Sequence, residues 1–187
     1  MKSNSLLKLT FFLFLITSTL LYSYHARRKF VALEGHESTP ILKTIPEVKF
    51  LDSFNNADFS FGLNSQDPIG SVVHFWGTWC GPCETELPSF ISLANEFEKD
   101  NLKFYLIAVN DEKLKLKKFL KRFKSFPKNI KIVLDNSGQA MDSFGVVKVP
   151  ETFVFNQSGQ TLKKFSGPQE WNFPYYHTLL KDILTLN

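Results

Sequence analysis

Two cysteines with two residues between them, Cys80 and Cys83, constrain this chain most, because they are the only cysteines in its 187 residues. A small secreted scaffold held by disulfides carries more cysteines, spread along the sequence. A structural zinc site usually needs four ligands, whereas the four histidines are isolated along the chain. We therefore predict no metal and interpret the pair as a redox site.

The cysteine pair lies between a predicted strand and a predicted helix. Residues 71–76 (SVVHFW) form a short apolar run that suits a buried strand. Residues 83–99 carry apolar side chains at spacings of three and four, which is typical of a helix, and residues 102–109 form a second strand. Strand, helix and strand of these lengths indicate a βαβ unit with parallel pairing.

After this unit, helical and strand patterns continue in short segments. The expected helices cover residues 112–124, 139–144 and 174–186. The expected strands cover residues 130–134, 151–155 and 161–165. A turn at residues 156–159 (NQSG) joins the last two strands into an antiparallel hairpin.

The net charge of +4 is unevenly placed, since residues 1–42 contribute +3 of it. The folded part is nearly neutral, which gives no support to nucleic-acid binding. Residues 112–124 nevertheless carry seven Lys and Arg residues around an apolar stripe. They are either a docking patch for an acidic partner or anionic lipid, or a solvated helix face, which we favour.

The N-terminus contains an almost wholly apolar stretch, residues 6–24. At helical rise these residues span roughly 28 Å, close to the thickness of a bilayer core. We predict a transmembrane anchor in residues 1–24, a linker in 25–42 and one domain in 43–187. A cleaved signal peptide is the alternative, although the sequence around Tyr24 has no good small-x-small cleavage site.

Positive charges flank the apolar stretch on both sides. Lys2 precedes it, Lys8 lies near its start, and Arg27, Arg28 and Lys29 follow it. The positive-inside rule therefore leans weakly toward a domain that faces the cytoplasm, a point that conflicts with the family resemblance described below.

The spacing of the two cysteines suits thiol–disulfide exchange. In a first helical turn their Cα atoms would lie roughly 5–6 Å apart, as a disulfide requires. Cys80 at the helix N-terminus would have a lowered pKa and attack as a thiolate, and Cys83 would resolve the mixed disulfide. Pro82 suits the first turn because no helical hydrogen bond is lost there.

Three motifs in order resemble the membrane-anchored TlpA/ResA/DsbE branch of the thioredoxin superfamily. They are residues 75–88 (FWGTWCGPCETELP), residues 149–153 (VPETF) and residues 167–171 (GPQEW). The resemblance runs from about Thr44 to the C-terminus. It implies an α/β thioredoxin-like fold, with a central mixed sheet flanked by helices, and a Cys80–Cys83 redox disulfide that needs no cofactor.

The same resemblance implies a function and a location. The expected activity is thiol–disulfide oxidoreduction, usually as a reductant, on the extracytoplasmic (periplasmic) side of a bacterial cytoplasmic membrane. The expected partners are a protein substrate with a disulfide, of which apocytochrome c in cytochrome c maturation is the most specific, and a membrane thiol donor. The alternatives are a non-catalytic thioredoxin-fold binding or redox-sensing module and a thiolate metal-delivery protein.

The branch also suggests which residues meet the substrate. Trp79, Gly81 and Pro82 surround the cysteines, and Pro150 would be a cis proline that leaves the Val149 backbone free to pair with an extended substrate. On the sequence alone, Pro150 is equally consistent with an edge-strand or turn proline.

Two further residues are candidates for proton transfer. Glu86 corresponds to the branch's acidic residue near the active site, and its alternative role is a first-turn helix acid. His74 departs from the family pattern. At this strand position thioredoxin has Asp, and this branch often has Asn or an apolar residue. It is a candidate proton shuttle or, as we favour, a hydrogen-bonded core histidine.

Overall fold

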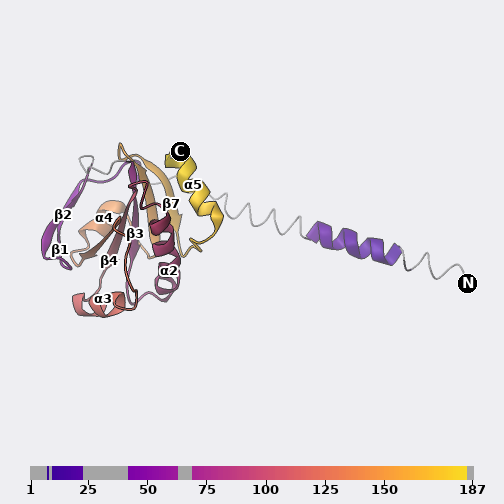
Figure 1. Cartoon of the computed structure of the whole chain (residues 1–187), viewed down its shortest axis with the longest axis horizontal. Helices are drawn as coiled ribbons and strands as arrows, with labels where there is room; N and C mark the ends of the chain where they lie inside the picture. The colour runs from indigo at the N-terminus through magenta and orange to yellow at the C-terminus, as the bar shows by residue number, and fades with distance from the viewer. Residues whose placement is uncertain (1–7, 9, 23–41, 63–68, 185–187) are drawn as a thin grey trace, which may run out of the picture. The chain divides into compact units, whose positions relative to one another are not determined.

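The structure is a computed structural model that describes residues 8, 10–22, 42–62 and 69–184. The chain divides into two compact units, Met1–Thr39 and Pro40–Asn187. In the second unit a central sheet is packed between helices and a strand hairpin (Figure 1).

The sheet has five strands in the order β5-β4-β3-β6-β7. The strands are β3 (Gly70–Trp76), β4 (Lys103–Val109), β5 (Ile130–Asp135), β6 (Glu151–Asn156) and β7 (Thr161–Ser166). β3 pairs parallel with β4 and antiparallel with β6, β4 pairs parallel with β5, and β6 pairs antiparallel with β7. The predicted mixed sheet and the βαβ unit are confirmed.

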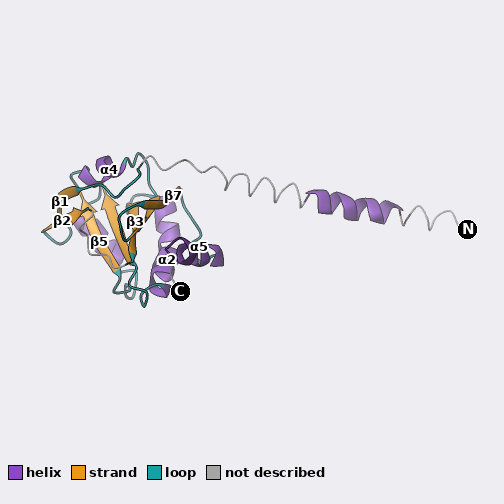
Figure 2. Cartoon of the chain, turned by 90° about the horizontal axis from the view of Figure 1, so that it is seen from above, coloured by secondary structure: helices purple, strands orange, loops and turns teal. Residues whose placement is uncertain are grey.

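Four helices belong to this unit: α2 (Gly81–Glu96), α3 (Lys113–Leu120), α4 (Gln139–Phe144) and α5 (Pro174–Leu184). Apolar side chains of α2, α3 and α5 form one core cluster with one face of the sheet, and α4 contributes to the cluster on the other face. Figure 2 shows α2 and α5 on the side of the sheet away from α4. The predicted helices are therefore all present, with ends that differ by a few residues.

Strand β3 lies at the centre of the sheet, and all seven of its residues are buried. Its two faces belong to different clusters, since Val72 and Trp76 face the α2 side while Val73 and Phe75 face the α4 side. Burial on both faces explains why the strand is a continuous apolar run. At the start of this strand, a Cβ on Gly70 would lie 2.3 Å from the Phe155 carbonyl oxygen, so only glycine fits there.

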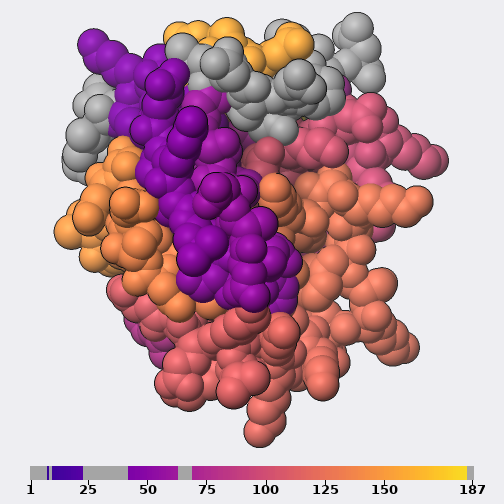
Figure 3. All heavy atoms as spheres, turned by 90° about the vertical axis from the view of Figure 1, so that its left-hand side faces the viewer, coloured from indigo at the N-terminus to yellow at the C-terminus, as the bar shows by residue number. Residues whose placement is uncertain are grey.

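A hairpin that our sequence analysis did not predict covers the α4 side. It consists of β1 (Val48–Asp52) and β2 (Ala57–Phe61), which pair antiparallel. Figure 3 shows it lying across one face of the molecule. The alternation of polar and apolar residues from Asp58 to Phe61 in β2 was the available sequence signal. The turn is held by Asp52, whose carboxylate accepts hydrogen bonds from the backbone N–H groups of Phe54 and Leu134.

In the first unit, residues 10–22 are helical. At helical rise this stretch is about 20 Å long, and among the described residues no helix is long and apolar enough to cross a bilayer. The ends of the predicted anchor, residues 6–24, lie outside the described residues, as does almost all of the predicted linker. The transmembrane helix therefore stays a prediction.

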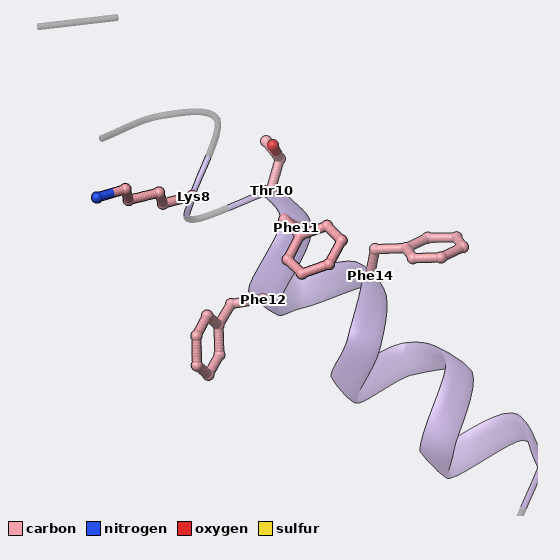
Figure 4. A pocket seen from close by; sticks show the side chains of 5 residues that line it. All are labelled: Lys8, Thr10, Phe11, Phe12 and Phe14. Atoms are coloured by element: carbon pink, nitrogen blue, oxygen red, sulfur yellow. The ribbon is translucent and has the colours of Figure 1, made fainter. Parts of the chain in front are cut away.

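The surface of this N-terminal helix is apolar. Phe11, Phe12 and Phe14 point away from the helix axis in different directions (Figure 4) and are 63–68% exposed. Among the described residues, these rings together with Lys8 and Thr10 line a shallow hollow on the open surface of the helix.

Candidate active site

The cysteine pair lies where β3 ends and α2 begins. Cys80 is the N-cap residue of α2, and its sulfur accepts a hydrogen bond from the Cys83 backbone N–H at 3.3 Å. The two cysteines form a disulfide, with their Cα atoms 5.3 Å apart, within the separation predicted from a first helical turn. The helix begins at Gly81, two residues earlier than predicted, so the pair spans that turn.

The two sulfur-bearing residues differ in their surroundings. Cys80 is 7% exposed, while Cys83 is completely buried in the core cluster on the α2 side. Gly81 and Pro82, between them, are exposed. A partner disulfide can therefore approach the pair only from the Cys80 side, and α2 presents its N-terminal dipole to that sulfur.

Trp79 directly precedes Cys80 in the chain. Its indole is 57% exposed, and its Nε1 donates a hydrogen bond to the Val109 carbonyl at 3.0 Å. A Cβ on Gly77 would lie 2.6 Å from this nitrogen, so the absence of a side chain at Gly77 lets the indole fold back onto its own loop.

The loop before the cysteines is tied to the end of β4. The Asp111 carboxylate accepts hydrogen bonds from the Thr78 backbone N–H at 2.7 Å and from the Thr78 hydroxyl at 2.9 Å. Neither residue was among the predicted site residues. The only signal was an acid placed directly after a strand that runs parallel to β3, since two such strands end at one edge of the sheet.

The second motif lies beside the exposed sulfur. The Val149–Pro150 peptide bond is cis, as the resemblance implies, and the Val149 carbonyl oxygen lies 4.0 Å from the Cys80 sulfur. Val149 is half-buried and Pro150 is buried, directly before β6. The structure thus brings together Trp79, Val149 and Pro150 around Cys80.

Behind the disulfide lies a buried pair of titratable side chains, His74 of β3 and Glu86 of α2. Glu86 follows Cys83 by three residues and shares its buried helix face. The His74 Nε2 and the Glu86 Oε1 are 3.6 Å apart. On its other side, the His74 Nδ1 lies 2.8 Å from the Thr152 hydroxyl, and the ring stacks on Phe90.

The second oxygen of Glu86 is bound by the third motif. Its Oε2 accepts hydrogen bonds from the Gln169 backbone N–H at 2.8 Å and from the Trp171 Nε1 at 3.0 Å. Motif 167–171 therefore contributes two donors to a carboxylate more than eighty residues away in sequence. The first-turn acid of α2 is Glu84, so the alternative role considered for Glu86 is wrong.

Burial moves the pKa values of the pair in opposite directions. Desolvation raises the pKa of Glu86 to about 7, against the lowering effect of its two N–H donors. Desolvation lowers the pKa of His74 to about 3, so this ring is neutral near pH 7. A proton on Nε2 suits both contacts of the ring, because Thr152 can then donate to Nδ1 while Nε2 faces the carboxylate.

Within residues 8, 10–22, 42–62 and 69–184, no three His, Cys, Asp or Glu residues are placed to hold a metal ion. The pair Cys80 and Cys83 is a disulfide in this structure.

The thioredoxin fold places a cysteine pair at the start of a helix that follows a central strand, with a cis proline beside the outer sulfur. Cys80, Cys83 and Pro150 have this arrangement on a sheet of the same pairing pattern, so the chain is a thioredoxin-fold protein with a cysteine-pair site. Residues 44–166, more than half of the chain, match the AhpC/TSA family, and the chain belongs to that family.

Known relatives agree with this assignment. The chain is 30% identical over 141 residues to the sporulation thiol-disulfide oxidoreductase A of Bacillus subtilis. The aligned region covers 73% of this chain and 79% of that relative. It is 35% identical over 99 residues to the thiol-disulfide oxidoreductase ResA of Geobacillus thermodenitrificans, which covers 52% of this chain but only 55% of that relative. The predicted resemblance to the TlpA/ResA/DsbE branch is confirmed.

A solved structure shows the same fold. A thiol:disulfide interchange protein of the thioredoxin family from Chlorobium tepidum superposes with a TM-score of 0.61 at 21% sequence identity. The superposition covers 76% of this chain and 96% of the Chlorobium tepidum chain, so the two share nearly the whole fold of that protein.

Proposed function

We propose that this chain is a protein thiol–disulfide oxidoreductase that exchanges disulfides at Cys80 and Cys83. One observation carries the proposal: the two cysteines form a disulfide across the first turn of α2, in which Cys80 is the more accessible at 7% exposure and Cys83 is completely buried. The names of the relatives, thiol-disulfide oxidoreductases, support it.

The reaction follows from the two positions. The reduced Cys80 attacks one sulfur of a partner disulfide, forming a mixed disulfide while the other partner sulfur leaves and takes up a proton. Cys83 then loses its proton and attacks the Cys80 sulfur, and the second partner sulfur leaves as a thiol. The partner gains two electrons and two protons, and the Cys80–Cys83 pair becomes the disulfide present in this structure.

In this proposal Glu86 accepts the Cys83 proton. It lies one turn along the same buried face of α2, and a carboxylate whose pKa is about 7 is better matched to a thiol than an ordinary one. His74 is then a positioning residue, because burial keeps its ring neutral while it faces the Glu86 Oε1. This role replaces the proton shuttle considered from the sequence.

Substrate binding is assigned to the surface around Cys80. An extended segment that pairs with the backbone at Val149 would lie next to the exposed sulfur, since that carbonyl is 4.0 Å from it. Trp79 and the exposed Gly81 and Pro82 would contact the same segment, and Pro150 would keep the Val149 backbone turned toward it.

The proposed direction is reduction of protein disulfides, with apocytochrome c as the most specific candidate substrate. The Gly81-Pro82 dipeptide resembles that of thioredoxin, whose potential is about −270 mV. An extracytoplasmic reductant needs a membrane thiol donor to reduce Cys80–Cys83 again, because that compartment lacks the cytosolic reducing systems.

The proposal includes a membrane anchor in residues 6–24, with the domain outside the cytoplasm. The apolar sequence and the exposed rings of Phe11, Phe12 and Phe14 support it. The full chain should remain with membranes after an alkaline wash, and a variant lacking residues 6–24 should not. Recovery of the full chain in the soluble fraction would contradict the anchor.

The direct test is a redox equilibrium of the full chain, in non-ionic detergent, with glutathione or dithiothreitol and with thiol alkylation as the readout. A potential near about −270 mV supports a reductant, and a value above about −150 mV, nearer that of DsbA, contradicts it. The Cys80→Ser variant is the control that forms no disulfide.

The two alternative functions give different results. A binding or sensing module would equilibrate with glutathione but fail to reduce insulin catalytically. A metal-delivery protein would retain copper after purification under reducing conditions, through the thiolates of Cys80 and Cys83.

A further inference from the structure

The basic residues of this chain are concentrated in one segment. Residues 113–134 contain nine of the 22 Lys and Arg residues and none of the 18 Asp and Glu residues. The rest of the chain, with 13 basic and 18 acidic residues, is therefore net negative. A segment of one sign in a chain of the other sign produces a strong local potential.

The structure places these charges on the surface. Helix α3 buries Leu116, Phe119 and Leu120 and turns its lysines outward. We call the exposed Lys115, Lys117, Lys118, Lys121, Arg122 and Lys124 the basic surface. Long side chains project from the salmon-coloured part of the molecule that includes α3 (Figure 3).

Four of these cations lack a carboxylate partner within the described part of the chain. Lys115 pairs with Glu112 at 2.7 Å, and Arg122 pairs with Glu84 at 2.5 Å. Among the described residues, the remaining members of the basic surface have no carboxylate partner, namely Lys117, Lys118, Lys121 and Lys124.

Helix stability accounts for only part of this surface, because the helix macrodipole favours Lys117 and Lys118 in the last turn of α3. Lys113 and Lys117 are four residues apart, as are Lys117 and Lys121, and like charges at this spacing destabilise a helix. An ordinary solvated face would mix the two signs and form pairs of opposite charge. The unmixed charge therefore indicates a ligand of opposite charge.

One member of the basic surface, Arg122, reaches the first turn of α2, the helix that carries the disulfide. Strands β3 and β4 run parallel, so the loop to Cys80 and the loop to α3 leave the same edge of the sheet. The Phe119 ring packs 5.4 Å from that of the last residue of β3, Trp76. Arg122 contacts Glu84, the residue after Cys83. A partner that reaches Cys80 would thus come close to these lysines.

We propose that the basic surface docks protein partners whose disulfide is flanked by Asp and Glu residues, and that it speeds their encounter with Cys80. The inference rests on the proposed exchange activity and names its substrate class as acidic polypeptide. An anionic lipid surface spread over α3 would also cover the edge that holds Cys80, and so would exclude the substrate. Complementary charge acts mainly on the association rate and is screened by salt.

The test compares three disulfide peptides with the same disulfide ring and with acidic, neutral or basic flanks. The reduced full chain, in non-ionic detergent, should reduce the acidic peptide about tenfold faster than the basic one at low salt. This ratio should fall toward one in 0.5 M salt. The variant Lys117→Glu/Lys118→Glu/Lys121→Glu should reverse the preference while reducing the neutral peptide at the normal rate.

A matched variant separates the position of the charges from their number. Lys43→Glu/Lys49→Glu/Lys99→Glu makes the same change in net charge at exposed lysines outside α3, and it should keep the preference for acidic flanks. Equal loss of preference in both variants would overturn the proposed docking surface.

The remaining outcomes are also distinct. If the neutral peptide is reduced but the acidic and basic peptides react equally fast, the docking surface is wrong and the exchange activity stands. If no peptide is reduced, the exchange activity itself fails. Binding to vesicles of anionic lipid can also be compared between the two triple variants. If the matched variant binds them more tightly than the α3 variant does, and the wild-type chain shows no preference among the peptides, the ligand of the basic surface is a membrane and not an acidic polypeptide.

Discussion

The two sides of the disulfide differ in the exposure of their polar side chains, which are buried on one side and exposed to solvent on the other. Behind Cys83, the side chains of His74 and Glu86 are almost completely shielded from water, and each is positioned by contacts from distant segments. In front of Cys80, Trp79 is more than half exposed and the lysines of α3 extend into solvent.

The difference teaches which interactions can be decisive in each region. In a buried site the effective dielectric is low, so one hydrogen bond or one proton changes the energy of its neighbours strongly. On the surface, water and salt weaken every single charge, and only the sum of several charges has an effect. We therefore expect single substitutions to matter behind the disulfide and grouped substitutions to matter in front of it.

The largest effect is expected at the boundary between the regions. Cys80→Ser should reduce disulfide reduction to background, because the attacking sulfur is lost, and Cys83→Ser should accumulate a mixed disulfide with substrate. Turnover of an insulin or peptide disulfide, with non-reducing electrophoresis, measures both. Residual turnover in Cys80→Ser would show that the exposed sulfur is not the nucleophile.

The next test compares two acids that are two residues apart. Glu86→Gln removes the buried carboxylate and should slow single-turnover reduction roughly 100-fold at pH 7, the scale of a lost general base. Glu84→Gln removes a half-buried surface partner of Arg122 and should slow it less than twofold. Equal effects of the two changes would remove the distinction between the regions.

The pH dependence of stability sharpens the account of the buried pair. The Glu86 pKa rises on folding to about 7. Its contribution to the free energy of unfolding is therefore present below about pH 4.5 and is lost as the pH rises to 7. The His74 pKa falls on folding to about 3, so its contribution increases as the pH rises from 3 to 6.5. Between pH 4.5 and 6.5 the two trends offset each other.

Single variants should expose each trend in urea denaturation. In Glu86→Gln the free energy of unfolding should increase between pH 4.5 and 6.5 by about 1 kcal/mol per pH unit, and in His74→Asn it should decrease by a similar amount. The wild-type chain should stay nearly level in this range. If the free energy of unfolding changes with pH in the same way in all three proteins, Glu86 and His74 do not make opposite contributions.

A smaller change tests one hydrogen bond in the buried region. Trp171→Phe keeps an aromatic ring but removes the indole N–H that donates to the Glu86 Oε2. Loss of this donor should destabilise the fold by about 1–2 kcal/mol and raise the pKa of Glu86 further. The pH–rate profile should then shift to higher pH by up to about one unit. An unchanged profile would mean that Glu86 does not set the rate.

The smallest effect is expected from one surface charge. Lys117→Ala should leave the free energy of unfolding within about 0.5 kcal/mol of the wild type. It should lower the rate with an acidic peptide less than threefold at low salt, and not at all in high salt. A single-lysine effect as large as that of Glu86→Gln would break the contrast between the two regions.

Much of the site was predictable because its determinants are local. The position of Cys80 at a helix N-terminus depends on the apolar run before it, the helical spacing after it and Pro82 in the first turn, which span fewer than thirty residues. The same local patterns predicted every strand of the five-stranded sheet and every helix of the domain within a few residues.

The contacts around the site were not predictable, since they join segments that are far apart in sequence. Asp111 meets Thr78 across 33 residues, and the β1–β2 hairpin packs on a face whose other half comes from α4. A local pattern indicates that a segment is amphipathic or that an acid follows a strand, but it does not say which distant group it contacts.

The sequence by itself therefore determined the α/β class, the order of the elements from β3 to α5 and a cysteine spacing that suits a disulfide at the start of α2, because helical and strand periods and turn spacing act over a few residues. Only the tertiary structure decided that Glu86 meets His74, Gln169 and Trp171 in a dry core, and that Arg122, just after α3, pairs with Glu84 in the first turn of α2. Those neighbours depend on sheet order and helix packing, which arise from the burial of the whole domain at once.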